Sequence, residues 1–206
     1  MQEKNNRKVV LFKIKLYLCS RNEDKTMKFE ELINGKLWAV RADDDNCHEL
    51  EILLDHWNDV VWLRNFFINN QDDLNAFYHV SIEDAIWDTI EDSDKIESML
   101  LELGENDDLD TLFRPLNNNE TAESLLQKDK ARLKDRPVHS SWLRVYAIRL
   151  STGAYIITGG AIKLTFKMEE REHTRNELDK IERVRNFLLN EHIIDEDSFI
   201  EYIAEI

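Results

Sequence analysis

Hydrophobic and polar residues alternate along two stretches of the C-terminal half, which predicts two neighbouring β-strands. A period of two residues is typical of a strand, and residues 143–150 oppose two alternating sets: Leu143, Val145 and Ala147 against Arg144, Tyr146 and Ile148. Residues 155–168 form a second, longer stretch, which Gly159-Gly160 can bulge or bend. A short turn that contains Gly153 joins the two, so the pattern predicts an antiparallel hairpin.

The second stretch also predicts which side chains are buried. Successive side chains of a strand point to opposite faces of the sheet. Residues of one parity are therefore expected to face the core: Ile156, Ile162, Leu164, Phe166 and Met168. Residues of the other parity are expected to face solvent: Tyr155, Lys163, Thr165 and Lys167. A bulge at the glycine pair would move Tyr155 to the other side but leave the run from Ile162 onward unchanged.

Two further strand patterns occur near the N-terminus. Residues 9–19 alternate as a strand does, and the Asn34-Gly35 pair is a tight-turn signal that predicts a hairpin between residues 28–33 and 36–41. A polar break separates the first run from Met27. Residues 1–26 are therefore interpreted as an upstream extension or an extra strand.

Helical spacing of apolar residues marks four further segments. These are residues 48–69; residues 81–104, with a break or kink at 91–94; residues 174–190, which Thr174 and Glu177 open as a capping box; and residues 195–206. Residues 106–116 and 117–119 are expected to be loops, and residues 120–136 to be helical or irregular.

The order of these elements predicts the α+β fold class. N-terminal helices and a small hairpin are expected to pack with a C-terminal antiparallel sheet and a closing helix. A chain of 206 residues is long enough to bury a sizeable core. We expect a single domain over residues 27–206, with the N-terminal hairpin and helix in 27–80 and an acidic tail in 191–206.

Charge is strongly segregated along the chain. The formal net charge is −15, but residues 43–110 hold 21 acidic and two basic residues, whereas residues 128–185 hold 14 basic and 8 acidic ones. Solvated helix faces are the ordinary explanation of such regions. They also suit an anionic partner on the basic side and a cationic partner on the acidic side. The local charge therefore removes the objection to RNA binding that the whole-chain charge raises.

Several classes of protein are disfavoured by the motifs that the sequence lacks. It has no dinucleotide-binding, P-loop, zinc-hydrolase, nucleophile-elbow or kinase signature, and we expect no cofactor and no metal site. Cys19 and Cys47 are too few for a disulfide scaffold, so a reducing cytoplasm is the expected compartment. The apolar run at residues 9–19 is too short to cross a membrane, and no membrane partner is expected.

Candidate chemistry lies on the predicted C-terminal hairpin and at the start of the helix that follows it. Lys, Arg, Tyr and His side chains on one surface suit RNA phosphate, and they also suit metal-free RNA cleavage, which needs a base, an acid and cations for the developing charge. The candidate catalytic residues are His173, Tyr146 and Lys163, and the candidate phosphate-binding residues are Arg144, Lys167 and Arg171. An ordinary polar sheet face, with His173 merely preceding the N-cap of the last helix, explains the same pattern.

The order of motifs over residues 81–190 resembles the RelE/ParE superfamily of type II toxins, and its phage-related HigB-like branch most. Phe113 and Leu116 stand in a loop that leads towards a strand with an Arg-hydrophobic-Tyr pattern, here Arg144 and Tyr146. The next strand ends in a Lys-containing stretch before a helix, here at Lys163. In that superfamily, helices precede a small antiparallel sheet.

The resemblance implies a ribosome-associated mRNA endonuclease that needs no metal. It also implies a small antitoxin as partner, which in this superfamily often carries a helix-turn-helix. A non-catalytic interaction or accessory protein of a mobile element, with a toxin-like sheet, is the alternative. Whether the chain is an enzyme is left open by the sequence.

Overall fold

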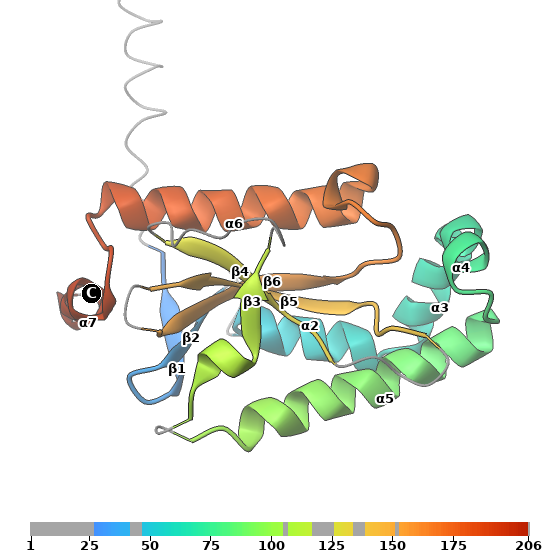
Figure 1. Ribbon diagram of the computed structural model, residues 1–206, viewed down its shortest axis with the longest axis horizontal. Coiled ribbons are helices and arrows are strands. Elements are labelled where there is room, and N and C mark those ends of the chain that lie inside the picture. The colour runs from blue at the N-terminus through green and yellow to red at the C-terminus, as the bar shows by residue number, and fades with distance from the viewer. Residues whose placement is uncertain are drawn as a thin grey trace, which may run out of the picture.

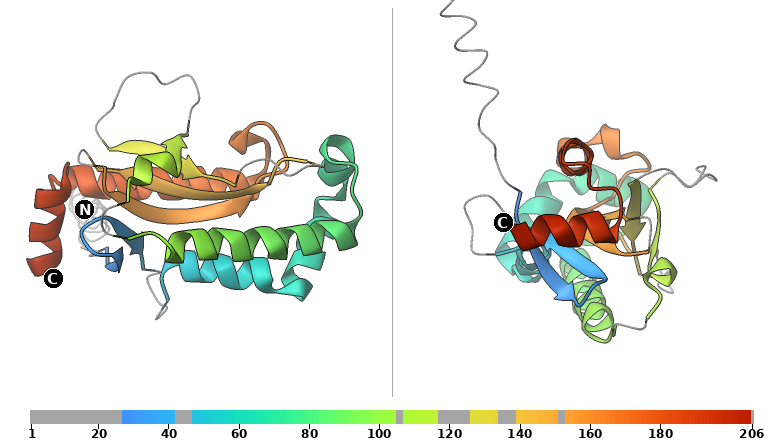
Figure 2. Two further views of the ribbon diagram at one scale, coloured as in Figure 1. Left: turned by 60° about the horizontal axis from the view of Figure 1, so that its bottom comes forward. Right: turned by 90° about the vertical axis from the view of Figure 1, so that its left-hand side faces the viewer.

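A six-stranded sheet crosses the molecule with helices on both faces (Figures 1 and 2). The computed structural model describes residues 27–41, 47–104, 107–116, 126–133, 139–150 and 153–205. The strand order is β1-β2-β6-β5-β4-β3, and every neighbouring pair is antiparallel except β2 and β6, which are parallel. The strands are β1 Phe29–Ile33, β2 Leu37–Val40, β3 Phe113–Pro115, β4 Gln127–Ala131, β5 Leu143–Arg149 and β6 Tyr155–Ile162.

Helices cover the sheet unequally. Of the helices that precede β3 in the chain, α2 Glu49–Asn58 and α5 Ile82–Leu101 pack against one face of the sheet. Helix α3 Val60–Asn69 packs on α2 and α5, and α4 Gln71–Phe77 follows it at one end of the molecule (Figure 1). Helix α6, Glu172–Asn190, lies along the other face, and α7, Glu196–Glu205, closes the end beside β1 (Figure 2). The α+β class predicted from the sequence is therefore confirmed. None of the helices in the described segments is long and apolar enough to cross a lipid bilayer.

Each face of the sheet has its own apolar core. Trp57, Leu63 and Phe67 belong to the core between the sheet and the N-terminal helices, whereas Ile181 and Leu188 of α6 belong to the core on the other face. The central strands are consequently buried on both sides, and every residue of β6 is buried. Tyr155 is 1% exposed and lies in the same core as Ile162, whereas Ile156 lies in the core on the other face. Tyr155 is therefore on the side predicted for a bulged strand, and not on the solvent side predicted for a regular one.

The strand β6 is shorter than the alternation predicts. It ends at Ile162, and a short 3-10 turn, η2, follows at Met168–Glu170. The residues between them leave the sheet, so their parity no longer determines burial. As a result Phe166, predicted to face the core, is 83% exposed, and Thr165, predicted to face solvent, is buried.

The bulge predicted at Gly159-Gly160 is confirmed. The pairing of β5 with β6 shifts there, because Tyr146 pairs with Gly159 while Ala147 pairs with Ile157. The φ angle of Gly159 is +152°, and a Cβ atom built on it would lie 2.2 Å from Oε2 of Glu177 on α6. Glycine at this position lets α6 pack closely against the bulged strand.

The two predicted N-terminal strands at residues 28–33 and 36–41 form the hairpin β1–β2, and Gly35 in its turn has a φ of +64°.

The helix expected at residues 48–69 is in fact two helices, because Asp59 ends α2 and caps α3. The predicted break at residues 91–94 is wrong, since α5 is continuous there. Helix α5 does begin after Ser81, as predicted, and its last residue is Leu101.

Two strands occur where none was predicted. The stretch expected to be helical or irregular, residues 120–136, contains β4, and the loop expected at residues 106–116 contains β3 together with the short turn η1, Leu109–Thr111.

The capping box predicted at the start of the last long helix is wrong: α6 begins at Glu172, and the buried Thr174 hydroxyl donates to the carbonyls of Met168 and Arg171. The helix ends at Asn190, as predicted, and α7 matches the last predicted helix. The strand predicted at residues 9–19, the extension 1–26 and the loop at 117–119 lie outside the described residues.

Candidate functional site

The predicted site residues lie in different places on the fold. Arg144 and Lys163 come together, and Tyr146 is buried beneath α6. Arg171 and His173 face α3 and α4 instead. Lys167 is exposed at the start of η2. The candidate site is therefore built around Arg144 and Lys163 alone among the predicted residues.

The pairing of β4 with β5 places a third cation, Lys130, near Arg144. Lys130 of β4 pairs with Tyr146, two residues along β5 from Arg144, so Lys130 and Arg144 lie on the same face of the sheet, the face that α6 covers in part. Lys163 follows β6 directly and remains tied to β5, because its backbone N–H donates to the carbonyl of Trp142. We call Lys130, Arg144 and Lys163 the basic cluster.

Backbone carbonyls hold the three side chains in place. Nζ of Lys130 donates to the carbonyl of Leu116 at 2.8 Å, and a guanidinium nitrogen of Arg144 donates to the carbonyl of Ser141 at 2.7 Å. Nζ of Lys163 donates to the carbonyls of Thr165 and Phe166, at 2.7 and 2.5 Å. These hydrogen bonds fix the positions of the two ammonium groups and the guanidinium group.

The three cations lie close enough to affect one another's charge state. Burial, and then the neighbouring charges of Arg144 and Lys130, lower the pKa of Lys163. Burial, and then Arg144 and Arg132, lower the pKa of Lys130. Like charges held together in a partly desolvated place disfavour protonation, and a bound anion relieves that repulsion. The electrostatics of the cluster therefore suit a phosphate.

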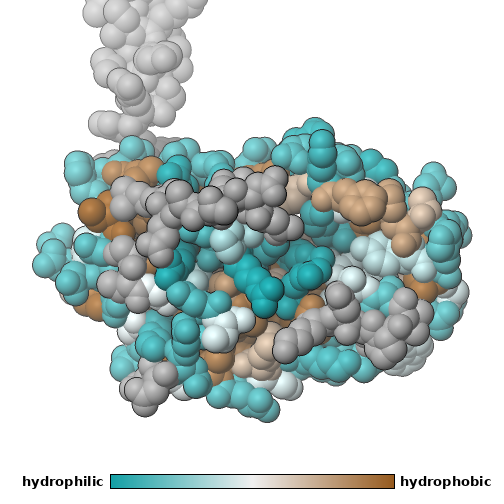
Figure 3. Space-filling model, viewed as in Figure 1, coloured by the Kyte–Doolittle hydropathy of each residue, from teal (hydrophilic) through white to brown (hydrophobic). Residues whose placement is uncertain are grey.

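More positive charge lies at the rim of the cluster. Arg114 of β3 pairs with Lys130 in the sheet, and both Arg114 and Arg132 are exposed. Strongly hydrophilic side chains gather over the β3–β4 edge of the sheet, between α6 and α5 (Figure 3). Helix α6 contacts β6 and β5 and reaches β4 through the ion pair of Glu182 with Lys128. The side chains of Lys130, Arg144 and Lys163 are half-buried, so the cluster is partly open to solvent.

Tyr146 shares the face of Arg144, as predicted, but it does not face solvent. Its side chain is fully buried, and burial raises the pKa of its hydroxyl. Within the described residues that hydroxyl makes no hydrogen bond. A bound RNA chain would have to displace α6 to reach it, so its burial disfavours the predicted catalytic role.

Arg171 and His173 make contacts with the N-terminal helices and with the end of β6, and not with the members of the basic cluster. The Arg171 guanidinium makes a two-bonded ion pair with Asp73 of α4, with N–O distances of 2.6 and 2.5 Å. Nε2 of His173 lies 2.9 Å from the carbonyl of Ile162, and its ring packs edge-on against Phe66. Both side chains thus join α6 to the N-terminal helices, and neither belongs to the basic cluster.

Lys130 is the site residue that the sequence reasoning missed. The strand that carries it, β4, could have been recognised from its alternation: the basic residues Lys128, Lys130 and Arg132 alternate with Asp129 and Ala131. It was obscured because the inward-facing set includes Gln127 and Asp129, which are polar yet buried. Burial raises the pKa of Asp129 to about 6, and Gln127 donates a hydrogen bond of 3.0 Å to its carboxylate.

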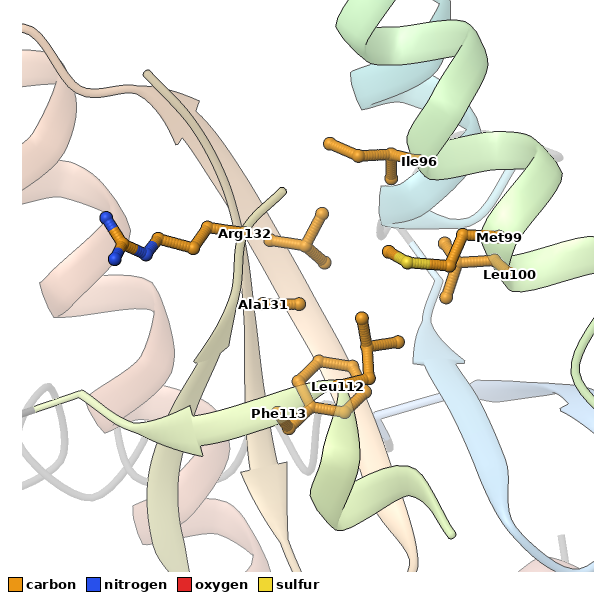
Figure 4. A pocket seen from close by; sticks show the side chains of 8 residues that line it. Ile96, Met99, Leu100, Leu112, Phe113, Ala131 and Arg132 are labelled. Carbon is orange, nitrogen blue, oxygen red and sulfur yellow. The ribbon is translucent and has the colours of Figure 1, made fainter. Parts of the chain in front are cut away.

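A separate apolar pocket of about 250 Å³, including its open mouth, lies on the opposite face of the β3–β4 edge. Ile96, Met99 and Leu100 of α5 form one wall and Phe113 and Ala131 the other, with the guanidinium of Arg132 pointing away from it (Figure 4). Every lining surface of the pocket is apolar, so it brings no catalytic groups together.

Comparison with family models, with curated proteins and with solved structures gave no match. In the described ranges, no three His, Cys, Asp or Glu side chains are grouped as metal ligands would be. The site is thus defined by its geometry: a cluster of partly buried cations on the antiparallel strands of a mixed sheet, near the edge formed by β3.

Proposed function

We propose that this protein is a RelE/HigB-like toxin of a type II toxin–antitoxin pair that binds RNA phosphate through the basic cluster. The single observation that carries the proposal is the convergence of Lys130 and Arg144, which share a face of the sheet, with Lys163, which directly follows β6 and is bonded to β5. The order of elements supports it, because helices α2 to α5 precede the antiparallel strands β4, β5 and β6. The Arg-hydrophobic-Tyr pattern lies on β5, and Lys163 lies between β6 and the closing helix.

The cluster also offers a route to cleavage that uses side chains alone. A lysine with a lowered pKa can accept the proton of a ribose 2′-hydroxyl, and Lys163 is the candidate because burial and its neighbours lower its pKa. The activated oxygen attacks the adjacent phosphorus, and the 5′-oxygen of the next nucleotide leaves. Arg144 and Lys130 stabilise the charge that develops on the phosphate, and protonated Lys130 can supply the leaving oxygen with a proton.

A second candidate function is RNA binding without cleavage, in an interaction or accessory protein. The burial of Tyr146 and the attachment of His173 to Ile162 favour it, because two of the three predicted catalytic residues are then structural. A direct assay separates the two functions. Purified protein is incubated with single-stranded RNA, alone and with translating ribosomes, and the products are analysed for new 5′-hydroxyl ends.

The partner that we propose is a basic antitoxin that covers the acidic helices. Helix α5 exposes Glu83, Asp84, Glu91, Asp94 and Glu97, while Lys95 is its one basic residue. This surface lies on the face of the sheet opposite α6, so an antitoxin bound there would leave the basic cluster accessible. Inhibition would then need a second segment of the antitoxin, one that reaches the β3–β4 edge.

Induced expression in a bacterial host tests the toxin proposal. We expect the intact protein to arrest growth, and the double variant Lys130→Gln with Lys163→Gln to restore it. Arg64→Gln is the matched control, since Arg64 is an exposed cation on α3 that pairs with Glu83. Equal thermal unfolding of the three proteins shows that folding is not the cause. Normal growth on induction of the intact protein would contradict the proposal.

A further inference from the structure

An exposed aromatic pair lies next to the basic cluster. Phe166 is 83% exposed, more than any other large hydrophobic side chain in the described segments, and Phe77 at the end of α4 is 42% exposed. Their ring centroids are 5.2 Å apart in an edge-to-face arrangement. An apolar patch covers the loop that leads from β6 to α6, beside hydrophilic surface (Figure 3). A phenylalanine so exposed contributes little to the core, and most of its surface is open to contact with a ligand.

The loop that carries Phe166 is well fixed. The ammonium group of Lys163 donates to the carbonyl of Phe166 itself and to that of Thr165, and the Thr165 hydroxyl donates to the carbonyl of Lys167 at 3.0 Å. Thr165 and Met168 are buried and anchor the loop on either side. The ring is therefore presented to solvent by a structured turn whose central contact is a member of the basic cluster.

This arrangement matches what single-stranded RNA requires of a protein. Non-base-paired strands are bound by cations that hold the backbone and by aromatic rings on which bases stack. Lys163 is three residues from Phe166 and touches its carbonyl, so a phosphate on the cluster and a base on the ring belong to the same or adjacent nucleotides. In duplex RNA the base faces are already stacked and closed to such a ring.

We propose that Phe166, supported from behind by Phe77, is a stacking platform for one unpaired base of a single-stranded RNA whose phosphate lies on the basic cluster. This inference rests on the proposed function and adds the substrate class to it. A protein partner would need a larger apolar surface than two ring edges. The cations beside the ring also favour a polyanion.

The test compares oligonucleotides with and without bases. Fluorescence anisotropy measures binding of the full chain to a labelled 2′-O-methyl oligoadenylate, which cannot be cleaved through its 2′-oxygen, and to an abasic oligomer of equal length. One stacked base is worth about 5- to 100-fold in affinity. We expect wild type to prefer the base-containing oligomer by about that factor, Phe166→Ala to lose the preference, and Phe166→Trp to keep it.

Two controls make the outcome specific. Trp87→Ala removes an aromatic ring that is 68% exposed on the acidic helix α5, and it should change neither affinity. Phe166→Leu keeps an apolar side chain without an aromatic face, and it should behave as Phe166→Ala does. If Phe166→Leu retains the full preference, the contact is merely apolar and the stacking inference is overturned.

The remaining outcomes separate the inference from the proposed function. If Phe166→Ala binds both oligomers as wild type does, stacking is overturned while phosphate binding stands. If it weakens binding to both oligomers equally, Phe166 positions Lys163 and does not stack. If wild type binds neither oligomer, the inference and the proposed function fall together.

Discussion

Tyr146 and Asp129 show how burial changes what a polar side chain can do. Both lie on central strands, where helices cover the two faces of the sheet. The Tyr146 hydroxyl is buried without a hydrogen-bond partner among the described residues, and the Asp129 carboxyl is 2% exposed. Burying a polar group without full compensation destabilises the folded state. Each residue therefore yields a prediction about stability.

Replacing Tyr146 with Phe removes a hydroxyl that gains no hydrogen bond in the folded protein. We expect Tyr146→Phe to leave the free energy of unfolding unchanged or to raise it by about 1 kcal/mol. RNA binding and any cleavage should be unchanged, because the hydroxyl does not reach the surface. Urea unfolding and the anisotropy assay measure both. Loss of cleavage at unchanged RNA affinity would instead restore a catalytic role to Tyr146.

The raised pKa of Asp129 predicts how stability depends on pH. Its folded-state pKa is about 6, whereas an aspartate in an unfolded chain has a pKa of about 3.9. Between these values the folded protein binds more protons than the unfolded chain, so its stability falls as pH rises from about 4 to 6. We expect Asp129→Asn to flatten this slope and to stabilise the protein at pH 7 by about 1–3 kcal/mol.

Urea unfolding of wild type and Asp129→Asn at several pH values measures this difference. Asp179→Asn, an exposed carboxyl on α6, is the control and should leave the slope unchanged. An unaltered slope in Asp129→Asn would show that other groups set the pH dependence.

Among the elements, the break between α2 and α3 illustrates a cap that overrides an apolar pattern. The apolar spacing continues through Asp59, but its carboxylate accepts from the N–H groups of Val61 and Trp62, at 2.8 and 3.1 Å. Those two groups are among the donors that a helix start leaves without backbone partners. The turn at Asp59 lets α3 pack against α5.

We expect Asp59→Ala to lower the free energy of unfolding by about 1 kcal/mol, the usual loss for an N-cap acid. Asp55→Ala is the matched control, since Asp55 is an exposed acid within α2 and does not cap a helix. Chemical denaturation of both variants measures the difference. Equal stability of the two variants would mean that packing alone sets this turn.

Elements in which apolar and polar residues recur with a clear period were predictable from the sequence. Elements that bury polar residues among apolar ones were not. The alternation on β5 and the Asn34-Gly35 turn identified their strands because local preference and tertiary packing agree there. Strand β4 escaped prediction because it buries Gln127 and Asp129. Consequently the basic cluster was only partly predicted, since Lys130 joins Arg144 through the pairing of β4 with β5.

Across the whole molecule, the positive and negative regions of the chain become different surfaces. Helix α5 lies on one side of the sheet and exposes its acidic residues to solvent there. The basic cluster lies on the other side of the sheet. A net charge of −15 opposes RNA at long range, so we expect the proposed binding to rely on close contacts with the cluster. Such contacts release counterions from the strand and weaken as salt is added.

The salt dependence of binding therefore counts the cations that touch RNA. For single strands the slope of log affinity against log salt is about −0.7 per phosphate neutralised. We expect a slope of about −2 if the basic cluster contacts three phosphates, and a slope smaller by about 0.7 in Lys130→Gln. Arg64→Gln should leave the slope unchanged. Anisotropy titrations at several salt concentrations measure these slopes.

The position of β6 has a consequence for how the protein is made. It is the last strand in chain order, yet it lies in the interior of the sheet, parallel to β2 and beside β5. A ribosome therefore releases the first hairpin and helices α2 to α5 before the strand on which their core closes exists. The apolar faces of these helices stay uncovered until residue 162 has emerged, which makes the nascent chain a client for chaperones. A message cut before that point would yield a chain that lacks a central strand of its sheet.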